Sequence, residues 1–156
     1  MQYWGGYGQC GKGNTIWREF ARPAQHPGTN SIIFKGKIWT MDSWDNENFT
    51  VQLLNANGQV MAERTQRGNN FERLGDETMR CSGSPTGGWD DGYFNVELTA
   101  PWSVADGAVT VKITNTLNQG TQDESIAYSD LFIKYTYDPT VTVPVPSTEP
   151  STPVIP

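Results

Sequence analysis

The chain has 156 residues and a formal net charge of −6 at pH 7, which gives enough length for one domain with a proper core and too little for two. A phosphate-binding face needs clustered Lys and Arg, so the acidic balance argues against a nucleic-acid partner or an anionic membrane surface. No apolar run is long enough for a membrane span, so we expect no membrane insertion.

The first half of the chain contains short strand patterns. The opening, residues 5–13, is rich in glycine and aromatic residues and predicts a tight loop; no Lys-Ser or Lys-Thr pair follows it, which disfavours a nucleotide site. Apolar and polar residues alternate in several runs, which is typical of half-buried strands. The predicted strands cover 15–20, 32–39, 49–54 and 60–64. The last two are joined by Asn-Ala-Asn-Gly at 55–58, a strong signal for an antiparallel hairpin.

The second half adds a long polar segment and three more strands. Residues 66–91 predict a loop, and loops of this length are usually functional or locally pinned. Strands are predicted at 93–98, 109–113 and 126–137, and no stretch keeps a helical period. The fold class is therefore all-β, a two-sheet antiparallel β-sandwich over residues 1–137.

Two acidic motifs stand at strand ends. Asp-Ser-Trp-Asp-Asn-Glu at 42–47 separates two predicted strands, and Asp-Glu-Ser at 123–125 precedes the last one. In a sandwich, corners from early and late strands can meet at one end, so we expect the two motifs to share a calcium ion, which relieves the repulsion between carboxylates held together. The alternative is a pair of solvated turns whose side chains cap their own backbone. The candidate calcium ligands are Asp42, Asp45, Glu47, Asp123 and Glu124.

Three weaker signals favour a location outside the cell or at its surface. Cys10 and Cys81 are the only cysteines, and a single disulfide between them is the economical interpretation, with two separate thiols as the alternative. Asn48 begins an Asn-Phe-Thr glycosylation sequon. The C-terminal segment is rich in threonine and proline, as in exported, O-glycosylated proteins.

The C-terminal segment, residues 138–156, is predicted to be an extended arm or linker. Val141, Val143 and Val145 fall on one face of an extended strand, ready to bury against a sheet. Pro144 and Pro146 remove N–H groups from one edge only, which an edge strand tolerates. We therefore expect the arm to donate a strand to a neighbouring subunit; the alternative is a flexible glycosylated linker.

Surplus aromatic residues raise the question of a glycan site. Trp89, Asp90 and Asp91 pair a flat ring with hydrogen-bond acceptors and are the candidate glycan contacts, whereas Trp17 and Trp39 lie in strand patterns and are predicted to be core. Catalytic motifs are missing from the sequence: there is one histidine and no nucleophile elbow. A glycosidase would need a carboxylate pair at a defined separation, which nothing in the sequence supports. We expect a protein that is not an enzyme.

The residues also resemble a known family. Gly-Gly-Tyr-Gly-Gln at 5–9, the motif at 42–47, Cys81 and the stretch 118–130 are similar to a repeated extracellular module of protist surface proteins, related to galactose-binding-like domains. The more specific motifs are Asp-Ser-Trp-Asp-x-Glu and Leu-Asn-Gln followed by Asp-Glu-Ser, here starting at Asp42 and Leu117. The resemblance implies a jelly-roll β-sandwich that often binds calcium and sometimes glycans, without catalysis.

The chain departs from that pattern in two places. Ile-Ala-Tyr at 126–128 replaces the usual Trp-Gly-Ile, and the residues that precede Gly-Gly-Tyr are absent, which predicts a sandwich without its opening strand. The resulting prediction is a non-enzymatic extracellular structural subunit of a surface coat or filament, calcium-stabilised, glycosylated and self-associating through its arm. The alternative is a calcium-dependent carbohydrate-binding or adhesion module of a surface protein.

Overall fold

The structure, a computed structural model, describes residues 3–5, 8–21, 29–69, 77–79, 91–103 and 106–137. Within these ranges no helix is long and apolar enough to cross a membrane. The strands are β1 (Tyr3–Gly5), β2 (Thr15–Phe20), β3 (Thr29–Asp42), β4 (Asp45–Leu54), β5 (Val60–Asn69), β6 (Glu77–Met79), β7 (Asp91–Pro101), β8 (Val109–Asn115) and β9 (Glu124–Tyr137).

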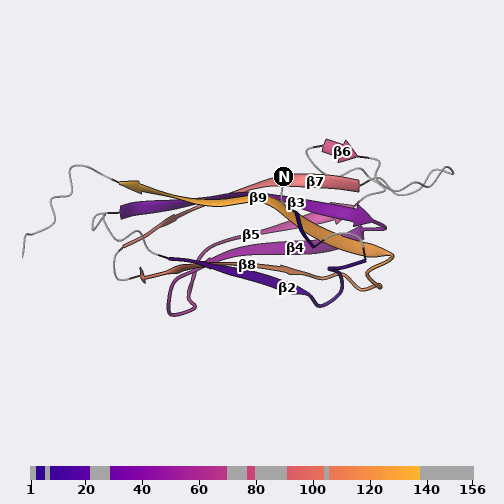
Figure 1. The fold of residues 1–156 in the computed structure, drawn as a ribbon, viewed down its shortest axis with the longest axis horizontal. Coiled ribbons are helices and arrows are strands. Elements are labelled where there is room, and N and C mark those ends of the chain that lie inside the picture. The colour runs from indigo at the N-terminus through magenta and orange to yellow at the C-terminus, as the bar shows by residue number, and fades with distance from the viewer. Residues whose placement is uncertain are drawn as a thin grey trace, which may run out of the picture.

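The strands form two antiparallel sheets that lie one above the other (Figure 1). The five-stranded sheet has the order β1-β9-β3-β7-β6, and the four-stranded sheet has the order β2-β8-β4-β5. On one side of the molecule the sheets touch where Arg64 Nη1 of β5 donates to the Asn95 carbonyl of β7, over 3.4 Å. The edge strand β2 of one sheet and the neighbouring strands β1 and β9 of the other therefore lie on the opposite side. The predicted all-β, two-sheet antiparallel sandwich is confirmed.

The core forms between the sheets because each strand turns alternate side chains inward. On β4, Phe49, Val51 and Leu53 are fully buried, as the period-two pattern predicts. They meet apolar residues of the opposite sheet, and the rings of Phe49 and Phe94 lie 5.4 Å apart between centroids.

The hairpin predicted from the Asn-Gly pair is present between β4 and β5. Gly58 takes a φ of +75°, a conformation that glycine adopts without steric cost. Asn55 Oδ1 accepts hydrogen bonds from the backbone N–H groups of Asn57 and Gln59, each over 3.0 Å. This side chain closes the turn, which fixes the register of the two strands.

The strands are longer than predicted, and one core prediction is wrong. β3 covers Thr29–Asp42, and β5 continues to Asn69, into the segment predicted as a loop. Trp39 is buried, as predicted, and packs with Tyr93 and Ala127. Trp17, also predicted to be core, is 69% exposed. Its strand, β2, is an edge strand, and the pattern showed two faces without showing which one points outward.

Candidate metal centre

The two acidic motifs meet at one end of the sandwich, as predicted. The backbone N–H and Oγ of Ser43 both donate to the Asp123 carbonyl, over 2.9 and 2.6 Å. Trp44 Nε1 donates to the Ser125 carbonyl over 2.8 Å, and the indole is fully buried. Burial of this large ring draws the first motif against the start of β9.

The first motif folds as a very tight corner in which only Ser43 and Trp44 lie between β3 and β4. Asp42 and Asn46 have φ values of 68° and 115°, in the left-handed region that Asp and Asn tolerate better than most residues. The Trp44 ring lies against Gly68 of β5, where an added Cβ would stand 2.5 Å from Cε3. The corner therefore depends on a glycine in the neighbouring strand.

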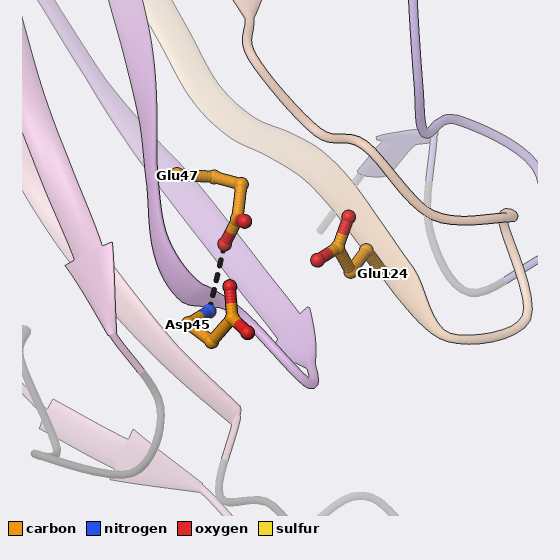
Figure 2. Close-up of side chains that lie close together, drawn as sticks. All are labelled: Asp45, Glu47 and Glu124. Atoms are coloured by element: carbon orange, nitrogen blue, oxygen red, sulfur yellow. Dashed lines mark hydrogen bonds between the residues drawn. The ribbon is translucent and has the colours of Figure 1, made fainter.

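Three carboxylates converge beside this corner: those of Asp45, Glu47 and Glu124 (Figure 2). One oxygen from each lies within 4.8 Å of the others. Asp45 is exposed, whereas Glu47 and Glu124 are 6% and 0% exposed. Because β4 carries Asp45 and Glu47 and β9 carries Glu124, this acidic cluster spans both sheets.

Hydrogen bonds hold the two buried carboxylates in place. Glu124 Oε2 accepts from the backbone N–H groups of Asn118 and Gln119, each over 2.9 Å. Glu47 accepts from Asn118 Nδ2 at Oε1, over 2.8 Å, and from the Asp45 N–H at Oε2, over 2.7 Å. Of the four carboxylate oxygens of Glu47 and Glu124, Glu124 Oε1 is the one that is buried without a hydrogen-bond partner.

Asn118 and Gln119 were not among the predicted site residues. They belong to the Leu-Asn-Gln motif that starts at Leu117, and its closeness in sequence to Asp-Glu-Ser was the available signal. Asn118 contacts both buried carboxylates, one through its side chain and the other through its backbone. It therefore positions the two glutamates relative to each other.

The acidic cluster has no positive charge to balance it among the described residues. The ion pairs among the described residues, Lys35 with Glu97 and Lys37 with Asp130, involve carboxylates outside the cluster. Burial raises the pKa of Glu47, with further contributions from its hydrogen bond with the Asp45 side chain and from the charge of Glu124. An ionised carboxylate buried without a partner is costly, so the cluster calls for either a proton or a cation.

The donor set fits a hard cation. All three groups offer oxygen, and oxygens within 4.8 Å of one another can lie on a sphere whose radius is the calcium–oxygen distance, about 2.3–2.6 Å. Glu124 Oε1 could become a ligand without giving up any hydrogen bond. The predicted metal site is therefore supported as a buried acidic cluster that could hold a metal ion.

The two other predicted ligands lie outside this cluster. The Asp42 N–H donates to Asp91 Oδ1 over 2.9 Å, and burial raises the pKa of Asp42 together with the charges of Asp91 and Asp123. Asp91, a predicted glycan contact, is 5% exposed and bound to this amide. Trp89 and Asp90, the other predicted glycan contacts, lie outside the described residues.

The remaining predicted sites are only partly within the described residues. The structure does not show the predicted disulfide: Cys10 has a free thiol whose pKa is raised by burial, and Cys81 lies outside the described residues. Asn48 of the sequon is half-buried on β4, with its N–H bonded to Thr116 Oγ1 over 2.8 Å. Val141, Val143 and Val145 of the arm also lie outside the described residues.

Comparison of the chain with protein-family models and with curated proteins finds no match. The resemblance to galactose-binding-like modules of protist surface proteins therefore stays a prediction. What the chain does has to be argued from the acidic cluster and its surroundings.

Proposed function

We propose that this chain is a calcium-stabilised, non-catalytic β-sandwich that serves as a structural subunit of an extracellular coat or filament. The observation that carries the proposal is Glu124 Oε1, which is fully buried, has no hydrogen-bond partner and belongs to a carboxylate that faces Asp45 and Glu47 (Figure 2). A buried acceptor left unsatisfied costs about 1–3 kcal/mol, and more for a charged group. A cation bound between the three carboxylates removes this cost.

Calcium suits the cluster better than the other common protein metals. The cluster contains neither histidine nor cysteine, the ligands that zinc and copper favour. Magnesium demands near-ideal octahedral geometry and gives up its waters reluctantly. Calcium accepts six to eight oxygens in flexible geometry, so exposed Asp45 and solvent can complete its shell.

The position of the acidic cluster implies a structural role for the ion. A cation held there bonds β4 of one sheet to β9 of the other and so closes this end of the sandwich. Burial of Glu47 and Glu124 also argues against a glycosidase, because a scissile bond has to lie between the two carboxyl groups. Of the three carboxylates in the cluster, only that of Asp45 faces solvent.

The extracellular assembly in this proposal rests on sequence features. The Asn48 sequon favours an exported, glycosylated protein. The Pro/Thr-rich arm, residues 138–156, gives each subunit a connector beyond its folded domain. Rigid sandwiches joined by such connectors are suited to a filament or surface coat.

Thermal unfolding of metal-free protein, prepared on a chelating resin, tests the calcium part of the proposal. The melting temperature should rise with the logarithm of the calcium concentration above the dissociation constant, because calcium binds the folded state alone. Magnesium at the same concentration is the control and should give a smaller shift. Identical melting temperatures at all calcium concentrations up to the millimolar range would contradict the proposal.

A further inference from the structure

One stretch of the five-stranded sheet has a strand on one side only. β1 pairs with β9 at Ala127, Tyr128 and Ser129, whereas β3 accompanies β9 as far as Tyr137. Within the part of the chain that the structure describes, residues 130–137 of β9 therefore form an edge. We call this stretch the β9 edge. Unpaired strand edges are templates for the addition of a further strand.

The margin of the core beside the β9 edge is apolar and incompletely covered. Leu131, Ile133 and Tyr135 of β9 pack against the core and stay half-buried. Ile16 and Phe20 of β2, on the same side of the opposite sheet, do the same. Apolar side chains from both layers are thus only partly covered along the margin where an additional strand would pair.

The outer faces of the same two strands carry exposed rings. Trp17 of β2 is 69% exposed, and Phe132 of β9 is 48% exposed. The two rings lie on opposite outer faces of the sandwich, so a strand added to the β9 edge would meet Phe132 and leave Trp17 uncovered. The partner of this margin has to offer apolar groups on both faces of its strand.

The arm of the chain itself has this pattern. Val141, Val143 and Val145 share one face, which suits the half-buried apolar margin. Pro144 and Pro146 lie on the opposite face, where their rings would meet the side of the sheet that carries Phe132. The missing proline N–H groups point away from the pairing edge and stop a further strand from joining.

Turn chemistry decides between the chain's own arm and that of another copy. A hairpin after β9 brings the valines to the face of Ile133 and Tyr135 only if its loop has an odd number of residues. The usual three-residue loop needs a helical backbone at its first residue and a left-handed backbone at its third. Here Pro139 disfavours the helical backbone at Asp138, and the β-branched side chain of Thr140 disfavours the left-handed one. A five-residue loop over residues 136–140 would keep all three valines paired with β9, but it would take Thr136 and Tyr137 out of their pairing with β3.

We propose that the β9 edge accepts residues 141–146 of a second copy of this chain as an added strand, which rests on the structural-subunit function proposed above. An arm arriving from another molecule needs no tight turn. Because donor and acceptor are different surfaces, the contact is head-to-tail and repeats without closing, so it generates an open filament.

The test compares the full chain with a chain truncated after Asp138, by sedimentation over a range of concentrations in calcium. The full chain should form species that grow with concentration, and the truncated chain should stay monomeric. A full-length variant with Val141, Val143 and Val145 changed to Asp should match the truncated chain. Hydrogen exchange should then show slower exchange at 131–137 in the assembled full chain than in either monomeric variant.

Each other outcome overturns this inference in a recognisable way. If the truncated chain assembles as the full chain does, the arm is not the donor, and the structural-subunit function survives. If assembly needs the arm but exchange at 131–137 is unchanged, the acceptor is another edge. Slower exchange at 131–137 in a full chain that stays monomeric would show that the arm folds back. If no form assembles and exchange is unchanged, the structural-subunit proposal fails as well.

Discussion

Changing Glu124 to Gln should have opposite effects on stability with and without calcium. Gln has almost the same shape, and its carbonyl can still accept from the N–H groups of Asn118 and Gln119. Its amide nitrogen replaces the buried Oε1 that has no partner and can donate toward Glu47 or Asp45. Without metal, the change removes an uncompensated buried charge, so the variant should be more stable than the wild type.

The expected magnitudes are large enough to measure. Relief of an unsatisfied buried acceptor is worth about 1–3 kcal/mol in the metal-free protein. Calcium at about 100 times its dissociation constant adds about 2.7 kcal/mol to the wild type. For a domain of this size, about 3 °C of melting temperature corresponds to 1 kcal/mol, so calcium should raise the wild-type value by roughly 8 °C. The Gln variant lacks one anionic ligand and should gain much less.

The assay is thermal unfolding of both proteins, metal-free and in calcium. Glu63→Gln is the matched control, because Glu63 is exposed and lies outside the acidic cluster. The control should keep the wild-type response to calcium, and the order of stability of Glu124→Gln and wild type should reverse between the two conditions. If Glu124→Gln lowers stability equally in both, Glu124 is an ordinary hydrogen-bond acceptor and the reasoning is refuted.

Three further predictions concern pH, packing and the cysteines. Burial raises the pKa of Glu47 above its ordinary 4.5, so the metal-free protein should lose stability as pH rises from about 4.5 through the raised pKa. Over the same pH range, the increase in melting temperature caused by calcium should grow. Melting curves against pH, with and without calcium, check both trends. Gly68→Ala should cost about 1–3 kcal/mol in denaturant unfolding, since its Cβ would overlap Trp44, whereas Gly120→Ala, with its nearest atom at 3.8 Å, should cost little; equal effects would contradict this account of the corner. The sequence predicts a Cys10–Cys81 disulfide that the structure does not show; if it forms, alkylation in denaturant without reductant leaves both cysteines unmodified, and two alkylated thiols in the mass spectrum would exclude it.

Most strands could be predicted because their residues alternate at period two, as in Phe49, Val51 and Leu53. The β4–β5 hairpin followed from Asn57 and Gly58. The prediction that Trp17 is core failed because β2 has an apolar residue on each of its two faces. The exposure of Trp17 depends on which of these faces the other sheet covers, and the alternation does not show this.

The meeting of the two acidic motifs and all three members of the acidic cluster were predicted, but Asp42 and Asp123 were predicted with them and lie outside the cluster. Asp42 stands opposite Glu124 in the pairing of β3 with β9, yet Asp45 and Glu47 are the residues that join Glu124. The left-handed backbone at Asp42 and Asn46 redirects the chain at the corner. These angles follow from the burial of Trp44 and its contacts with β9 and β5, which short-range sequence patterns do not contain.

Calorimetric titration of calcium into the metal-free protein at neutral pH tests the central claim most directly. The account predicts one ion bound per chain and a much weaker or absent signal for Glu124→Gln. The Glu63→Gln control should bind as the wild type does. Absence of binding by the wild type, or equal binding by Glu124→Gln, would contradict the claim that the cluster of Asp45, Glu47 and Glu124 is a calcium site.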